Sequence, residues 1–492
     1  MTIHLTTVLF VPLITGFVGA FLPRDGTRWA SLIGTLIVLA YVVAMLVDFD
    51  PGGGLQYVTD DEWIPELGIH YSLGVDGLNL FMIALTAIAW VPCTLVAAFT
   101  ELERPRLFFF HLGLAETAVL GAFMAQDLAL FIVFFDLMLV PFYFLIGGWG
   151  TGDRVRATTK FVIYTLSGSL LMMAAAIALG VLATPDGGSI SFSLADLRAH
   201  PVALGSQEWI VLLFALAFFV KAPLFPLHGW VPETYRSTSI PVLALLSGVL
   251  SKVGVYGFLR IVLPIMPGGA EHWQELFIIL AVFSILYGSV LAFSQDNIRL
   301  VIAYSSIAQL GFIVLGIFAF ADNGAQGALL QMLNHGLVVV PLFLIVGVIA
   351  LRARGSESLT ELGGMAFRAP VLAGLFLVVS LATLAMPGSG NFIGEILILF
   401  GTFEDQFVYG LVAAVGVVLA AVYMIRLYQG TMHGRVGAAV ESREIDRVNL
   451  AAVVPLVAVV IALGLYPQFV VHRTEKATTK ALEPATGVSV IR

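Results

Sequence analysis

The amino-acid sequence predicts an all-α integral membrane protein with about 14 transmembrane helices. The helices are expected to form two inverted five-helix repeats, each with one broken helix. Of the 492 residues, 59% are hydrophobic, and the mean hydropathy is +0.98. Charged residues make up only 11%, against roughly 25% in ordinary soluble domains. These figures exclude a soluble globular enzyme and a disordered chain.

Apolar runs bounded by charges or turn residues mark the expected spans. They cover 3–22, 29–47, 78–100, 107–125, 127–149, 158–183, 208–229, 239–262, 273–294, 298–320, 325–351, 370–402, 406–431 and 449–471. The first run lacks a basic flank and a small-residue cleavage site, so we expect a retained helix and not a signal peptide. The expected units are three N-terminal helices (1–106), two repeats (107–262 and 273–431), and a last helix with a tail (432–492).

Basic residues of short loops predict the orientation, because lysine and arginine stay on the cytoplasmic side. Alternate loops are basic, whereas the largest loop of the opposite set, 48–77, is acidic and has no lysine or arginine. Both termini are therefore expected on the non-cytoplasmic side of a bacterial inner membrane. The tail does not follow this pattern; its basic residues are Arg473, Lys476, Lys480 and Arg492.

The seventh and twelfth spans are expected to break inside the membrane. The seventh contains Pro223 and Pro226 shortly after Lys221, and proline removes a backbone donor and clashes with the preceding turn. The twelfth contains Pro387 followed by two glycines, and Glu395 lies just beyond them. Matching interrupted segments in two halves are typical of secondary transporters, where they mark the transport site. The simpler alternative is a pair of proline kinks in a helix bundle.

Ionisable residues inside the spans are the main functional candidates, because each costs about 2.5–3.5 kcal/mol to insert and normally faces the bundle interior. The candidates are Glu116, Asp136, Lys221, Lys252 and Glu395, with His228, His335 and Gln309 as polar companions. Proton hopping along such a row is one function, and static structural pairing is the alternative. Arg260 and Arg426, near span ends, are interpreted as anchors.

Each candidate also has a structural interpretation. Asp136 and Lys221 form either a proton relay or a fixed ion pair, and Glu116 is either an acid or a helix–helix contact. His335 is a proton carrier, because histidine titrates near neutral pH, or a plain hydrogen-bonding group. For Glu395 and His228, the alternative is capping of a half-helix.

The sequence also excludes several kinds of chemistry. One cysteine, Cys93, is too few for an internal disulfide, a Cys-ligated iron–sulfur cluster or a C-x-x-C-H haem site. The histidines show no metal-binding spacing, and no basic patch suggests nucleic acid. Proton movement here must therefore be driven by an ion gradient or by another subunit, since no P-loop or redox motif is present.

Five segments together resemble the antiporter-like subunits of respiratory complex I, the NADH–quinone oxidoreductase. They read FFDLMLVPFYF (134–144), VKAPLFPLHGWVP (220–232), LSKVGVYGFLR (250–260), DNIRLVIAYSS (296–306) and AMPGSGNFIGE (385–395). The resemblance runs from about residue 70 to 430. It is strongest to the subunit M branch, because Glu395 stands where the L and N branches usually carry lysine.

The resemblance implies 14 core helices and a place in the membrane arm of a proton-translocating enzyme, between L-like and N-like subunits. It implies no cofactor on this chain, with FMN, iron–sulfur clusters and quinone on other subunits. By motif match, Asp136 and Lys221 take the carboxylate–lysine pair, Lys252 the central lysine and Glu395 the outer acid. His335 matches a histidine of the central axis, and Glu116 matches a fourth-helix carboxylate.

Two positions depart from the family pattern. Asp136 stands where glutamate is usual, so its reach toward Lys221 is one methylene shorter. Gln309 stands where many members have histidine, and glutamine cannot titrate. A relay there would run through water or through the neighbouring Tyr304, Ser305 and Ser306.

The sequence is also compatible with two other functions. One is a subunit of a multi-subunit cation/proton antiporter, which predicts Na⁺-dependent exchange without NADH. The other is a structural spacer of the membrane arm, which predicts that Lys221→Ala leaves pumping intact.

Overall fold

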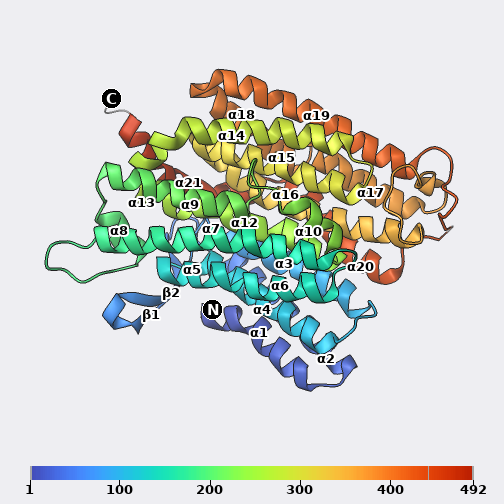
Figure 1. Cartoon of the computed structure of the whole chain (residues 1–492), viewed down its shortest axis with the longest axis horizontal. Coiled ribbons are helices and arrows are strands. Elements are labelled where there is room, and N and C mark those ends of the chain that lie inside the picture. Colours follow the sequence, from blue (N-terminus) through green and yellow to red (C-terminus); the bar gives the residue numbers. More distant parts are fainter. Residues whose placement is uncertain (1–2, 442, 490–492) are drawn as a thin grey trace.

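The chain is helical along most of its length, and its long helices run side by side (Figure 1). The computed structural model describes residues 3–441 and 443–489. Within these residues, twelve helical stretches are long and apolar enough to cross a membrane. Two shorter apolar helices, α1 (Leu5–Phe21) and α17 (Pro370–Thr383), accompany them. The protein is therefore a mostly helical, multi-pass membrane protein.

The regular long helices follow the predicted spans with shifted ends. They are α2 (Arg24–Asp48), α3 (Leu80–Ala98), α4 (Pro105–Met124), α7 (Arg154–Leu182), α9 (Leu204–Lys221), α14 (Pro267–Ser294), α15 (Ile298–Phe318), α16 (Asp322–Arg352), α19 (Phe407–Met432) and α20 (Arg447–Leu465). Several extend beyond the predicted run, because helices continue past the apolar stretch into polar residues.

Both predicted breaks are present. The α9 helix ends at Lys221, and a turn over 222–230 leads to the short helix α10 (Val231–Ser237). The α17 helix ends at Thr383, and α18 (Gly390–Asp405) begins after a second turn. Interrupted backbone inside a membrane requires other partners for its polar groups. At the first break, the Ser284 hydroxyl accepts from the Phe225 N–H at 3.0 Å, and the Trp230 indole donates to the Val220 carbonyl at 2.9 Å.

Two other spans are less regular than the sequence predicts. The fifth divides at Met138 into α5 (Leu128–Leu137) and α6 (Leu139–Trp149), where Pro141 cannot donate to the Leu137 carbonyl. The eighth contains α11 (Ile240–Leu245), α12 (Ser251–Gly257) and α13 (Leu263–Ile265). Two π-helical turns, η2 (Leu246–Leu250) and η3 (Phe258–Val262), flank α12. Such turns are frequent at functional sites.

The segment 48–77, expected to be a loop, contains an antiparallel hairpin. Its strands are β1 (Gln56–Ile64) and β2 (Ile69–Val75), with the short helix η1 (Pro65–Leu67) between them. Gly68 follows η1 with φ of 59°, a conformation that favours glycine. The overlooked signal is the set of aromatic and β-branched residues in both strands.

The last predicted span is also corrected. The expected helix over 449–471 ends at Leu465, and a separate helix, α21 (Gln468–Ser489), replaces the expected tail. Its buried side chains recur at helical spacing, as in Thr474, Thr478 and Ala485. Gln326 of α16 donates to the Thr474 hydroxyl at 2.6 Å and accepts from Thr478 at 2.7 Å, so α21 lies at the end of the bundle where α16 begins. Two small elements, α8 (Leu194–Ala199) and η4 (Met365–Phe367), complete the fold.

The arrangement of helices separates a buried interior from an apolar exterior. The eighth span, α15 and α16 are buried on nearly all sides, whereas α2, α7, α14, α19 and α20 leave one apolar face exposed. A close helix contact positions the centre: a Cβ on Gly254 of α12 would lie 2.6 Å from the Phe218 carbonyl oxygen of α9. Only glycine allows α12 to pack this tightly beside Lys221.

Candidate functional site

A central lysine–histidine pair occupies the middle of the bundle. The Lys252 ammonium nitrogen of α12 lies 2.8 Å from Nδ1 of His335 on α16. It also donates to the Ser247 carbonyl at 2.8 Å and to the Ser251 hydroxyl at 3.2 Å. Both ionisable side chains are fully buried, and Nε2 of His335 has no protein partner. The pair therefore has one contact through which a proton can pass and one free ring nitrogen.

Glu395 lies in a second polar cluster, on the first turns of α18. Its Oε1 accepts from the Gln309 amide of α15 at 2.8 Å and from Gln331 of α16 at 3.5 Å. Gln331 also donates to the Gln309 oxygen at 2.7 Å. The other carboxylate oxygen, Oε2, is buried without a protein partner. The half-helix is capped by Ser389, whose hydroxyl accepts from Phe392 N–H at 3.3 Å, so Glu395 does not have the capping role considered above.

Hydroxyl groups lie between the two clusters and beyond them. Ser247, whose carbonyl accepts from Lys252, has its hydroxyl 3.3 Å from that of Ser306 on α15. One residue earlier, Ser305 donates to the Tyr423 hydroxyl of α19 at 3.0 Å. The α15 helix therefore presents hydroxyl groups toward both the lysine side and the α19 side of the row.

The expected carboxylate–lysine pair is present without direct contact. Lys221 is 4% exposed and donates to the Phe135 carbonyl at 3.4 Å. Its ammonium also lies 4.5 Å from the centre of the Phe135 ring, a cation–π contact. Asp136 interacts electrostatically with Lys221 and lies beside the Ser169 hydroxyl of α7, but the two charges are not within ion-pair distance in the described structure. The shorter aspartate side chain is consistent with this gap.

Glu116 lies apart from these clusters. It is fully buried on α4, and neither of its carboxylate oxygens has a protein partner. Its surroundings come from the N-terminal helices: Thr15 of α1, Ser31 and Thr35 of α2, and Thr94 of α3 line the same small void. The structure thus places this predicted site residue among α1–α4 and not beside Lys221 or Lys252.

Two further predicted residues take other positions. The His228 ring stacks on Phe225, its Nδ1 has no partner, and no side chain caps α10, so the proposed capping role is wrong. Tyr304 is half-buried, and its electrostatic neighbours are Tyr287, Arg236 and Glu233 instead of the Glu395 cluster. Pro223, Pro226 and Pro387 lie in the two turns that interrupt the helices, as expected.

Several polar residues of these clusters were not singled out from the sequence. Gln331 and Tyr423 are examples, as is Ser247. A signal existed for Gln331, because it precedes His335 by one helical turn on α16 and therefore lies on the same face. Tyr423 gave no such signal, since an isolated tyrosine in an apolar helix is ordinary.

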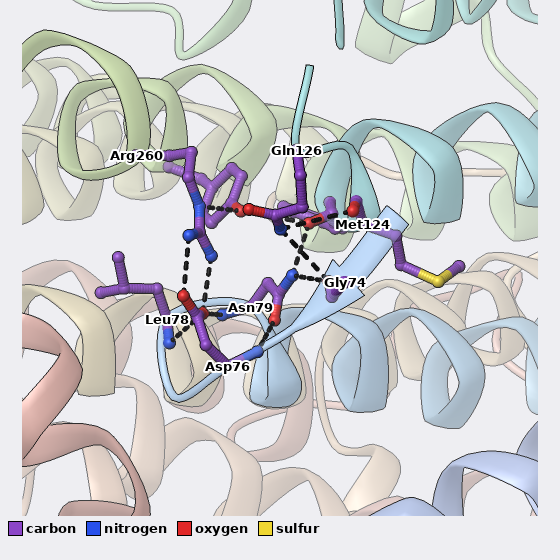
Figure 2. A network of polar contacts seen from close by, with 9 residues as sticks. Gly74, Asp76, Leu78, Asn79, Met124, Gln126 and Arg260 are labelled. Carbon is purple, nitrogen blue, oxygen red and sulfur yellow. Dashed lines mark hydrogen bonds and ion pairs between the residues drawn. The ribbon is translucent and has the colours of Figure 1, made fainter. Parts of the chain in front are cut away.

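Arg260, interpreted as an anchor, is instead one half of a buried ion pair at the hairpin end of the bundle (Figure 2). Its two terminal nitrogens donate to the Asp76 carboxylate at 2.7 and 2.6 Å, and its Nε donates to the Tyr256 hydroxyl at 2.7 Å. Burial by itself would raise the pKa of Asp76, but the Arg260 guanidinium and the Leu78 and Asn79 N–H groups hold it below its ordinary value. This pair fixes the start of α3 to η3.

Arg299 makes a similar contact at the other end of the spans. It lies in the first turn of α15, donates to the carbonyls of Tyr235, Arg236 and Thr238, and pairs with Glu357. Within the described residues, no group of three or more histidine, cysteine, aspartate or glutamate side chains could hold a metal ion.

Comparison with known proteins agrees with this arrangement. The family described as "NADH:quinone oxidoreductase/Mrp antiporter, TM" matches residues 125–422. NADH-quinone oxidoreductase subunit M of Mycobacterium tuberculosis (strain CDC 1551 / Oshkosh) is 36% identical over 94% of this chain and 91% of its own. The Rhodobacter capsulatus protein of the same name is 35% identical, over 95% and 94%.

Solved structures show the same fold. A chain of respiratory complex I from Thermus thermophilus with bound NADH superposes with a TM-score of 0.90, at 29% identity, over 98% of this chain and 100% of that one. A chain of the Mrp complex from Dietzia sp. DQ12-45-1b gives 0.84 at 22% identity, over 100% of both chains, which concerns the fold alone. Because the family model matches residues 125–422 and these relatives are about 35% identical over most of the chain, this chain belongs to the transmembrane family of NADH:quinone oxidoreductase and Mrp antiporter subunits.

Proposed function

We propose that this chain is a proton-translocating membrane-arm subunit of an NADH–quinone oxidoreductase. The observation that carries the proposal is the series of buried polar clusters across the bundle, from Lys221 through Lys252 and His335 to Glu395. Free hydrogen-bonding atoms within it, Nε2 of His335 and Oε2 of Glu395, leave room for water between the side chains. Protons would hop along this row, and electron transfer in other subunits would drive them.

The positions of these residues in the two proposed repeats support the same function. In the unit 107–262, Asp136 lies on the second helix, Ser169 on the third and Lys221 on the broken fourth. In the unit 273–431, the corresponding helices carry Gln309, Gln331 and Glu395, which bond one another.

With an odd number of helices per unit, the second copy would be inverted, and α1 and the α17–α18 segment would bring the total to about fourteen spans. The same site would then be built twice, once around a lysine and once around a glutamate.

The proposal includes the chain's surroundings. We place it in a bacterial inner membrane with both termini on the non-cytoplasmic side, between L-like and N-like subunits. FMN, iron–sulfur clusters and quinone would lie on other subunits, and this chain would carry out no redox chemistry. One observation supports the placement of the termini. The α1 helix contacts the hairpin and α21 packs against α13, so the described ends of the chain lie at the same end of the bundle.

A tagged copy of this chain, purified in mild detergent, tests the assembly. We expect it to bring flavin- and iron–sulfur-containing partners and NADH–quinone reductase activity. A colourless all-membrane assembly with Na⁺/H⁺ exchange would instead establish the cation/proton antiporter.

Lys221→Ala tests the role of the chain within the complex. We expect an assembled complex in which proton pumping per NADH falls, with Lys160→Ala, whose lysine pairs with Glu233 at 2.6 Å, as the matched lysine control. If an assembled Lys221→Ala complex pumped protons normally, the chain would instead be a structural spacer of the membrane arm.

A further inference from the structure

A cavity of about 680 Å³ opens at the hairpin end of the bundle. Its walls come from the end of α2, the segment before α3, α8, the end of the eighth span and α21. Several spans begin or end at this level, so the cavity lies where a membrane surface would be. The Asp76–Arg260 pair forms part of its lining (Figure 2).

Besides the paired Arg260, four basic side chains line this cavity: Arg198, Arg473, Lys476 and Lys480. In the described residues, none of the four has a carboxylate within ion-pair distance. Arg198 and Arg473 donate only to the carbonyls of Lys480 and Phe469, and Nε of Arg473 is buried without a partner. The four charges are therefore not neutralised by acids of the chain.

Acidic groups near the cavity do not offset this charge. Asp76 is the one carboxylate of the lining, and Arg260 holds both of its oxygens. Asp50 lies at the rim, near Gly52 and the Lys476 ammonium but beyond ion-pair distance. The cavity keeps a clear excess of positive charge, which makes it suitable for an anion.

We propose that this cavity binds the phosphate group of an anionic phospholipid. Arginine and lysine side chains bind phosphate by charge-assisted hydrogen bonds, and arginine forks match phosphate geometry. Apolar residues, including Phe49, Leu78, Leu194 and Ile265, line the same cavity and would contact the glycerol and upper acyl chains. A free phosphate ion would use the basic residues alone, so the mixed lining favours a lipid.

The proposal also gives a reason for the basic tail. Arg473, Lys476 and Lys480 violate the loop-charge pattern of the rest of the chain. On α21 they project along one stretch of helix into the cavity, together with Arg198 of α8 from a distant part of the sequence. Their positions are explained by a local ligand and need not bear on membrane orientation.

The test is Lys476→Gln combined with Lys480→Gln in the intact assembly. Both side chains are exposed, so the fold is expected to persist. Native mass spectrometry would compare retention of phosphatidylglycerol with that of phosphatidylcholine carrying the same chains. Each basic residue near a membrane surface strengthens anionic binding roughly fivefold, so the double variant is expected to lose about twenty-fivefold in affinity for phosphatidylglycerol.

The matched control is Arg368→Gln with Arg435→Gln, which removes the same charge from exposed residues at the other end of the spans. The control is expected to retain phosphatidylglycerol as the wild type does. Equal retention by both double variants would overturn the proposal. So would loss of a protein subunit with lipid unchanged, which would assign the cavity to an acidic protein partner.

A binding measurement with inorganic phosphate distinguishes a lipid headgroup from a free phosphate ion. Calorimetric binding of inorganic phosphate as tight as that of phosphatidylglycerol would overturn the lipid assignment in favour of a free ion. If the double variant fails to accumulate, Lys480→Gln alone is expected to lose about fivefold, and unchanged lipid retention there would also overturn the proposal. Lipid retention does not depend on pumping, so this result stands separately from the proposed function.

Discussion

The Lys252 ammonium nitrogen and Nδ1 of His335 lie 2.8 Å apart in a part of the bundle where both side chains are fully buried. A charged lysine donates to a histidine whose proton is on Nε2, and a neutral lysine accepts from a histidine protonated at Nδ1. The same geometry therefore serves both states. Moving a proton between the two groups requires no helix displacement.

His335→Gln tests whether this histidine carries protons. Glutamine can keep a hydrogen bond to Lys252 but cannot take up a proton. Because positioned proton-transfer groups contribute about 10²–10⁴-fold, coupled pumping is expected to fall at least about tenfold in an assembled complex. Proton uptake by proteoliposomes during NADH oxidation measures this, with His111→Gln, a histidine stacked on Phe144, as control. Wild-type pumping by His335→Gln would make the histidine a packing residue.

The gap between Asp136 and Lys221 leads to a second prediction. Asp136→Glu adds one methylene, which brings the carboxylate toward the lysine, so we expect pumping within about twofold of the wild type. Asp136→Asn keeps the size but removes the charge, and pumping is expected to fall at least about tenfold. Asp127→Asn is the matched control, because the Asp127 carboxylate accepts from the backbone N–H groups of Leu130 at 3.0 Å and His70 at 3.2 Å and lies near no lysine of the row. Equal pumping by the Asn variant at position 136 and the wild type would remove Asp136 from the pathway.

Arg299 and Arg426 provide a stability comparison. Arg299 is buried and joins Glu357 to three carbonyls, so Arg299→Ala removes the ion-pair partner of a partly buried carboxylate and the donor of three carbonyls. The loss is expected to cost about 3 kcal/mol of unfolding free energy. Arg426 pairs with Asp296 and donates to two carbonyls, but at a partly exposed site where water can replace it. Arg426→Ala is therefore expected to cost only about 1 kcal/mol. Labelling of the buried Cys93 during heating measures unfolding of this chain. A similar loss in both variants would contradict the prediction.

The ion pair of Asp76 with Arg260 is expected to make the stability of the folded chain depend on pH. Its pKa is lowered in the folded chain, so its contribution is complete above the ordinary aspartate pKa of about 3.9 and is lost as the pH falls through the lower folded value. Asp76→Asn is therefore expected to lower the unfolding temperature at neutral pH, with a difference from the wild type that shrinks below about pH 4. Loss of helical circular dichroism on heating, measured across pH 3–7, checks the trend. If the unfolding temperatures of Asp76→Asn and the wild type differed more at acid pH than at neutral pH, the prediction would be wrong.

Hydropathy and local chemistry predicted most of the secondary structure. The spans and the two breaks at Pro223 and Pro387 follow from residues close in sequence, because apolar length and missing backbone donors act locally. The hairpin and α21 were missed for a related reason. Both are amphipathic elements without a long apolar run, and their weak patterns become stable only when they pack against the end of the bundle.

The sequence by itself determined that this chain crosses a membrane and which few ionisable residues are buried in it. The tertiary structure decided their partners: Lys252 contacts His335, Glu395 contacts Gln309, Asp136 and Lys221 stay apart, and Glu116 faces the N-terminal helices. The physical reason is that the sequence leaves the rotation of each helix about its own axis undetermined. A helix that is apolar on every side has no preferred face, so only packing against its neighbours fixes the direction in which each polar side chain points.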